Sequence, residues 1–213
     1  MAFKGWPAEA IEFFDGLEAD NSKAYWHEHK AIYERDVKAP MDELLAELAA
    51  EFGTGKVFRP YRDTRFSKDK TPYKTNIAAT NDGGYITLSS QTFGVGTGLY
   101  MPAADQLERF RVAVAHDTTG ADLERIVATL RKKHIEVSGH EALKTAPKGY
   151  PKDHPRIELL RQKGLVSWKQ WPVGAWLGRR TSMNRVVEFL HDSQPMNDWL
   201  AKNVGPSALP PTR

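Results

Sequence analysis

The hydrophobic pattern of this chain changes its period once, near residue 55, and that change limits the possible folds. Before it, apolar residues recur at helical spacing, beginning with Ile11, Phe14 and Leu17. After it, the apolar residues fit no helical stripe, and Pro60 would break a helix interior. We therefore expect an α+β fold with a helical N-terminal quarter and a mainly antiparallel sheet on which helices pack.

Three helices are expected in the first quarter. The first follows Pro7, and the second begins at a cap within residues 20–22. Pro40 is expected to interrupt the second helix, because proline lacks a backbone N–H and crowds the preceding turn. The third helix is expected to end at Gly53.

An antiparallel meander of three strands is expected next. The strands are expected at Lys56 to Phe66, Tyr73 to Thr80 and Tyr85 to Ser90. The following glycines at alternate positions, Gly94, Gly96 and Gly98, would leave one face of an extended segment bare. We expect an aromatic ring or a neighbouring strand to fill that face, because the G-x-G-x-x-G spacing of dinucleotide sites is absent.

We expect a single domain over residues 1–204 and a frayed tail over residues 205–213, because 213 residues with 40% hydrophobic content can build one core. The later elements are expected to be helices at Pro102 to Ala115, from Thr119 onward, at Pro155 to Lys163, at Ser182 to His191 and at Pro195 to Asn203, with strands at Ile135 to Val137 and, at an edge, Leu165 to Trp168. The sequence does not indicate an oligomeric state.

The composition excludes several classes of chemistry. The chain has no cysteine, which rules out disulfides, thiolate nucleophiles and cysteine-ligated zinc. No apolar run approaches the roughly eighteen residues that a membrane span needs. We expect a cytoplasmic protein without a membrane partner.

Positive charge is concentrated between Arg59 and Lys74. This segment contains six basic and two acidic residues, which gives it a net charge of +4, whereas the whole chain has a net charge of +3. Arginine forks and lysine ammonium groups bind phosphate and carboxylate groups. We therefore expect a small anionic ligand, a phosphate or carboxylate compound, to be held by Arg59, Arg62, Arg65, Lys70 and Lys74.

Catalysis is an open alternative. Asp63 and Asp69 are candidates to hold a metal or act as a base in a metal-dependent phosphoryl-transfer or phosphoester-hydrolysing enzyme. Tyr73 and His154 are weaker catalytic candidates. No cofactor motif is present, and no metal site is expected from the histidines of the His-Glu-His run at 27–29, which would point in opposite directions on a helix.

Two further alternatives concern binding and structure. In a nucleic-acid-binding module, the basic residues would follow the phosphate backbone while Tyr61, Phe66 and Tyr73 stack on bases. In a structural ion-pair lattice, Asp63 and Asp69 would neutralise the nearby cations and lock strand to loop. An interaction role would then fall to the tryptophans at 168, 171 and 176.

Several motifs resemble those of a widespread, mostly bacterial conserved-hypothetical family known as a domain of unknown function. The central one is R-D-T-R-F-S-K-D-K-T-P-Y-K at Arg62 to Lys74, an instance of the signature R-D-x-R-F-S-x-D-K-x-P-Y-K. Similar motifs lie at Phe13 to Trp26, before Pro102 and at Asp153 to Lys163. The resemblance spans nearly the whole chain and implies an α+β domain, but it implies no activity, substrate or cofactor.

Overall fold

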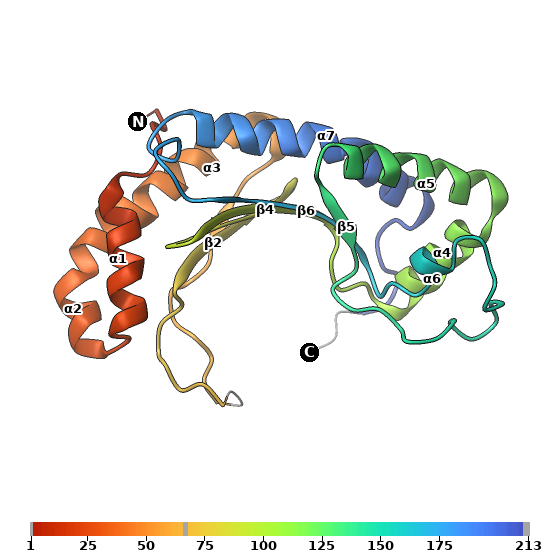
Figure 1. Cartoon of the computed structure of the whole chain (residues 1–213), viewed down its shortest axis with the longest axis horizontal. Coiled ribbons are helices and arrows are strands. Elements are labelled where there is room, and N and C mark those ends of the chain that lie inside the picture. The colour runs from red at the N-terminus through yellow and green to blue at the C-terminus, as the bar shows by residue number, and fades with distance from the viewer. Residues whose placement is uncertain (1, 66–67, 211–213) are drawn as a thin grey trace. The chain divides into compact units, whose positions relative to one another are not determined.

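In the computed structural model, which describes residues 2–65 and 68–210, the first quarter of the chain is helical (Figure 1). α1 (Ala8–Ala19) follows Pro7. α2 (Lys23–Ile32) begins at Ser22, whose hydroxyl accepts a hydrogen bond from the backbone N–H of Tyr25. The expected N-terminal cap within residues 20–22 is therefore present.

The expectation that Pro40 interrupts the helix is wrong. α2 continues through a π-helical turn, η1 (Tyr33–Lys38), directly into α3 (Ala39–Phe52). In η1 the backbone N–H of Ala39 bonds the carbonyl of Glu34, five residues back. Pro40 then occupies the first turn of α3, where the missing N–H and fixed φ are tolerated.

The sheet has six strands in the order β1-β2-β3-β4-β6-β5. The strands are β1 (Lys56–Val57), β2 (Asn76–Asn81), β3 (Gly84–Ser89), β4 (Thr92–Leu99), β5 (Glu136–Ser138) and β6 (Leu165–Pro172). β1 pairs with β2, β2 with β3 and β5 with β6, each antiparallel. The α+β class with a helical N-terminal quarter is confirmed.

Two strand predictions need correction. The strand expected at Lys56 to Phe66 is regular only over β1, because residues 58–75 leave the sheet as a hairpin, here called the basic arm; Phe66 lies outside the described residues. The segment expected as an edge strand at Leu165 to Trp168 belongs to the longer β6, which lies between β4 and β5.

The remaining helices are α4 (Ala104–Ala115), α5 (Asp117–Lys132), α6 (Ile157–Leu160) and α7 (Thr181–Asn203). Thr119, expected as a cap, lies inside α5, and its hydroxyl donates to the carbonyl of Ala113. The two helices expected at the C-terminal end are one helix, α7, which contains Pro195. Pro195 is exposed, and burial of Phe189 and Met196 on its two sides offsets the cost of an internal proline.

The chain divides into two compact units. Unit 1 comprises Met1–Val95 and Gln170–Phe189, and unit 2 comprises Gly96–Lys169 and Leu190–Arg213. β4, β6 and α7 each contribute residues to both units. The single domain expected over residues 1–204 stays a prediction.

In unit 1, the two faces of the β1–β3 sheet differ in character. On one face, Ile77 lies opposite Leu88 and Ala79 opposite Ile86, and all four are buried. α3 contacts β1 and β2 on this side, and Figure 1 shows it running along the sheet. The alternate residues of the same strands form the other face, which no described helix of unit 1 covers (Figure 1).

In unit 2, the bare glycine face of β4 is filled by an aromatic ring, as expected. A Cβ atom added to Gly96 would lie 2.7 Å from Cε3 of Trp168. Nearby, the buried hydroxyls of Ser167 and Ser193 are 2.9 Å apart and form a hydrogen bond. The core of this unit is completed by buried apolar residues of α4, α5, α6 and α7, among them Phe110, Leu123, Val127, Leu160 and Trp199.

Asp105 in the first turn of α4 holds the segment that follows α7. Its carboxylate accepts hydrogen bonds from the backbone N–H of Ala208 and the hydroxyl of Ser207, both at 2.8 Å, and from Arg109 at 3.0 Å. Fraying of residues 205–213 stays a prediction, and the described part of that tail is hydrogen-bonded to α4. No helix in the described residues combines the length and the apolar character that a membrane crossing needs.

The Asp105 network predicts a loss of stability in acid. The hydrogen bond from Ala208, followed by those from Ser207 and Arg109, holds the pKa of Asp105 far below its ordinary value of 3.8. The folded state therefore gains stability from Asp105 above about pH 4, and this gain is lost as the pH falls below that value. Between pH 5 and pH 3, the urea midpoint should fall less for Asp105→Asn than for the wild type, while Asp153→Asn, an exposed control, should behave as the wild type does. An equal fall in all three proteins would contradict this role.

Candidate functional site

The basic arm is a two-stranded hairpin whose base is held by backbone hydrogen bonds. The N–H of Arg62 donates to the carbonyl of Pro72 at 2.9 Å, and the N–H of Lys74 donates to that of Pro60 at 2.8 Å. Tyr61 and Tyr73 form an antiparallel bridge between them. The prolines stiffen both sides of the hairpin, because proline fixes its own φ. Figure 1 shows the arm as the yellow loop that leaves β2 beside α1 and α2.

Asn21 and Trp26 anchor this hairpin to the N-terminal helices. The side-chain amide of Asn21 donates to the carbonyl of Tyr73 at 3.1 Å, and its oxygen accepts from the N–H of Tyr73 at 3.0 Å. The Tyr73 ring stacks on Trp26, with centroids 4.4 Å apart and planes 8° from parallel. Both rings are buried, so the arm is fixed at its base by two hydrogen bonds and an aromatic stack.

Tyr73 is therefore placed as a packing residue. It is 4% exposed. Burial, with a smaller contribution from Tyr61, raises the pKa of its hydroxyl. A raised pKa disfavours the phenolate that nucleophilic or base catalysis would need.

Asp69, one of the two aspartates of the arm, contacts Thr71 and Arg62 of the same hairpin. It accepts hydrogen bonds from the N–H and the hydroxyl of Thr71 at 2.9 and 2.7 Å, and it forms an ion pair with Arg62 at 2.6 Å. Arg62 also donates to the Thr71 hydroxyl at 2.9 Å. The hydrogen bonds from Thr71, followed by the charge of Arg62, lower the pKa of Asp69.

The other aspartate of the arm, Asp63, binds Arg65 through both carboxylate oxygens. Arg65 Nε and Nη2 donate to Asp63 Oδ1 and Oδ2 at 3.0 and 2.7 Å. The side-chain and backbone hydrogen bonds from Arg65 lower the pKa of Asp63, to which Arg59 contributes a smaller electrostatic effect. Because both partners are largely exposed, water screens this pair and it contributes little to stability.

The other expected ligand-binding residues are spread along the arm. Lys70 donates to the carbonyl of Thr64 at 2.8 Å, and the Lys74 ammonium lies 5.7 Å from the centre of the Phe58 ring. Within the described residues, no carboxylate lies in ion-pair range of Arg59, Lys68 or Lys74. The expected cations therefore lie in one arm, and Arg62, Arg65, Lys70 and Lys74 contact different groups there.

A pocket of about 450 Å³ lies between the edge strand β1 and the helices of unit 1. It is lined by Tyr33, Glu34, Lys38, Lys56, Val57, Phe58, Arg59 and Pro60. Of its three cations, the sequence analysis identified only Arg59. Lys38 lies on η1 and is distant in sequence, so no local pattern could indicate it, whereas Lys56 directly precedes the basic segment.

His154 lies in unit 2, at the N-terminal side of α6. Its Nδ1 atom accepts a hydrogen bond from the backbone N–H of Arg156, the residue before α6, at 3.0 Å. His154 belongs to unit 2, whereas the arm belongs to unit 1.

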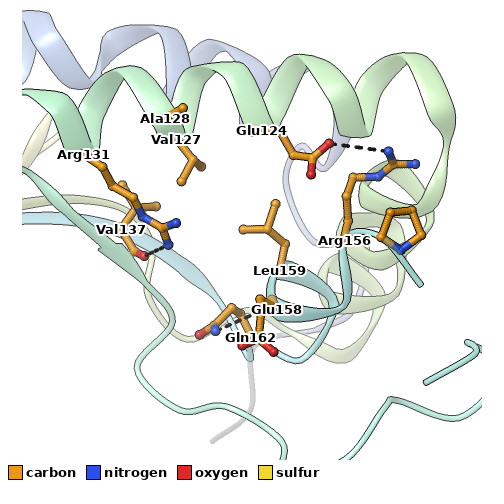
Figure 2. Close-up of a pocket in the computed structure, with 10 residues that line it drawn as sticks. Glu124, Val127, Ala128, Arg131, Val137, Arg156, Glu158, Leu159 and Gln162 are labelled. Atoms are coloured by element: carbon orange, nitrogen blue, oxygen red, sulfur yellow. Dashed lines mark hydrogen bonds and ion pairs between the residues drawn. The ribbon is translucent and has the colours of Figure 1, made fainter. Parts of the chain in front are cut away.

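A second pocket, of about 360 Å³, lies in unit 2 beside α6 (Figure 2). Arg156 closes one end, is only 8% exposed, and donates to the carbonyls of Val114 and Ala115. Figure 2 shows its ion pair with Glu124 of α5, at 3.6 Å, and Leu159 pointing between them and Arg131. Arg156 donates its hydrogen bonds to the last backbone carbonyls of α4, so we interpret it as a residue that holds the end of α4 in place.

The described residues contain no group of three or more His, Asp or Glu side chains placed to hold a metal ion. Asp63 and Asp69, the aspartates considered for that role, each bind an arginine instead. In α2, His29 stacks on Tyr25 and bonds its carbonyl at 2.9 Å.

Residues 9–199 match the model of a family described as "Conserved hypothetical protein (DUF2461)". This match covers most of the chain and includes the whole basic arm. A comparison with curated proteins found no match.

The anchor at Asn21 predicts a local change in protection of the arm. Replacing Asn21 with Ala leaves the N–H and carbonyl of Tyr73 without their partner, so Asn21→Ala should lower the free energy of unfolding by about 1–3 kcal/mol. Amide hydrogen exchange should quicken at Tyr73 and Lys74 more than in α4. The exposed neighbour Lys23 provides the control, since Lys23→Ala should leave both quantities unchanged. Unchanged exchange at Tyr73 in Asn21→Ala would contradict the anchoring role.

Proposed function

Because the chain belongs to the conserved hypothetical family DUF2461, for which the match supplies no activity, we propose from the arm itself that the protein binds an anionic ligand. The basic arm is the binding element, and phosphate or carboxylate groups are the chemistry that it recognises.

The observation that carries this proposal is the excess of unpaired positive charge on the arm. Both aspartates are already bound, Asp69 to Arg62 and Asp63 to Arg65. Arg59, Lys68 and Lys74 have no carboxylate partner among the described residues. Like charges on one hairpin repel each other, so an anion that lies along it would relieve that repulsion.

The rigid base of the arm also favours binding. Asn21 and Trp26 hold Tyr73 in place, so the neighbouring Lys74 is positioned before any ligand arrives. Preorganisation of this kind lowers the conformational entropy that is lost on binding. An ion-pair lattice accounts for Arg62 and Arg65, but it leaves the other cations unexplained.

A catalytic role for Asp63 or Asp69 is less favoured by the same contacts. A general base works best when its pKa lies near the operating pH. The pKa values of both carboxyl groups are lowered, and both groups are engaged with donors from the arm. We therefore propose that these aspartates stabilise the arm and do not act as catalytic bases.

Matched charge variants test the proposal. In the arm variant, Arg59, Lys68 and Lys74 are replaced together by Gln; in the control variant, Lys132, Lys144 and Lys148, three exposed lysines of unit 2, are replaced by Gln. Both variants lose the same net charge. By isothermal titration calorimetry at low salt, the arm variant should bind tripolyphosphate at least about tenfold more weakly than the wild type, since each lost contact is worth about 0.5–1 kcal/mol. The control should bind nearly as the wild type does.

Two results would contradict the proposal. The first is the absence of tripolyphosphate binding, and of citrate binding as the carboxylate probe, by the wild type. The second is an equal loss of affinity in both variants, which would indicate that overall charge rather than the arm determines binding.

A further inference from the structure

The pocket beside β1 collects cations from two distant parts of the sequence of unit 1. Lys38 belongs to η1, Lys56 belongs to β1, and Arg59 follows two residues after the end of that strand. All three line the same volume of about 450 Å³, a size that holds a small molecule. We call this space the root pocket, lined by Tyr33, Glu34, Lys38 and residues 56–60.

The two walls of the root pocket each depart from regular structure. η1 is a π-helical turn, a rare element that often occurs at functional sites, and both its first and its last residue line the pocket. On the other wall, β1 is the edge strand of the sheet and ends at Val57. Residues 58–60 are therefore free of the alternation that a strand imposes, and all three line the same space.

The cations of the root pocket are charged and accessible. Lys56 and Arg59 are exposed, and neither has a carboxylate partner in ion-pair range among the described residues. Lys38 donates a hydrogen bond to Asp42 at 2.7 Å, and this bond raises the pKa of the Lys38 ammonium group. An ammonium group has three donors, so Lys38 can bind a ligand while it keeps Asp42.

Most of the remaining lining is apolar. Phe58 is 37% exposed although it is large and apolar, and Val57 and Pro60 lie on either side of it in the chain. Tyr33 adds a buried ring on the helical wall. A lining of this kind favours an apolar or aromatic group, because the pocket removes that group from water.

Three cations beside apolar surface fit one class of anion. A phosphate monoester presents three terminal oxygens and up to two negative charges, so three basic side chains can bind it, whereas a carboxylate group has two oxygens and one charge. Glu34 lowers the formal charge of the lining from +3 to +2, which a phosphate dianion balances. The organic group of such an ester supplies the apolar surface.

We propose that the root pocket binds a small phosphate monoester, with its phosphate group held by Lys38, Lys56 and Arg59 and its organic group packed on Phe58. This proposal rests on the anion binding proposed for the arm, since Arg59 belongs to both sites. It names the class of ligand and adds two cations that lie outside the arm.

Three probes test the two parts of the ligand on the wild-type protein. Phenyl phosphate, methyl phosphate and benzoate are compared by isothermal titration calorimetry at fixed ionic strength and pH 8, where both esters are dianions. Phenyl phosphate should bind about tenfold or more tightly than methyl phosphate, because only the phenyl ring is buried against the apolar lining. It should also bind more tightly than benzoate, which carries the ring on a carboxylate group. Equal binding of phenyl phosphate and either other probe would overturn the proposal.

Variants locate the ligand. Lys56→Gln removes a pocket cation outside the arm, so it should weaken phenyl phosphate binding about tenfold through the loss of a charged hydrogen bond. Lys68→Gln removes an exposed arm cation that does not line the pocket, and Lys148→Gln removes an exposed lysine of unit 2; both should match the wild type. Phe58→Ala should weaken binding of phenyl phosphate but leave that of methyl phosphate nearly unchanged. Circular dichroism and thermal melting establish that each variant is folded.

The outcomes separate the two proposals. If tripolyphosphate binding depends on the arm but Lys56→Gln binds phenyl phosphate as the wild type does, anion binding stands and the pocket inference is wrong. If Lys68→Gln weakens phenyl phosphate binding as much as Lys56→Gln does, the ligand lies along the arm and the pocket inference is again wrong. If the wild type binds none of tripolyphosphate, citrate and phenyl phosphate, both proposals are wrong.

Discussion

The pairing of the Asn21 side chain with the backbone of Tyr73 is the contact on which the rest of the site depends. With the stack of Tyr73 on Trp26, it ties a polar, proline-rich hairpin to the helical part of unit 1. A hairpin of this composition has little apolar surface of its own and would otherwise lose conformational entropy without compensation. The anchor therefore explains how an exposed segment presents Lys74 and its neighbours in a defined place.

A second constraint is the ratio of charges on the arm. Two aspartates shape the hairpin, because Asp69 fixes the turn through Thr71 and Asp63 holds the Arg65 fork. They pair with Arg62 and Arg65, and Arg59, Lys68 and Lys74 keep no carboxylate partner among the described residues. In the proposed anion-binding role, the acidic residues thus set the shape of the arm and the unpaired basic residues set its charge.

The sequence predicts those features that local chemistry determines. The helical quarter, the Ser22 cap and the ring over the bare glycine face follow from spacing and from the needs of the backbone. The predicted break at Pro40 is wrong because the helix continues through a π-helical turn and Pro40 lies in the first turn of α3. The predicted break before Pro195 is wrong because burial of residues on both sides of Pro195 outweighs the cost of a proline inside α7. The basic segment was found from composition, and the ion-pair alternative already paired Asp63 and Asp69 with nearby cations. Asn21 and Lys38 were not found, because they are distant in sequence and reach the site only through folding.

The most direct test of a preformed arm with surplus positive charge is the affinity of Asp63→Asn for tripolyphosphate at low salt. This change removes one negative charge and releases the Arg65 fork, while asparagine can still accept from the N–H of Arg65. Binding should become about two- to fivefold tighter than in the wild type, in keeping with the modest energy of one exposed charge interaction. Asp153→Asn, which is exposed in unit 2, should leave the affinity unchanged. Weaker binding by Asp63→Asn would contradict this view, because it would mean that the carboxylate itself takes part in holding the ligand.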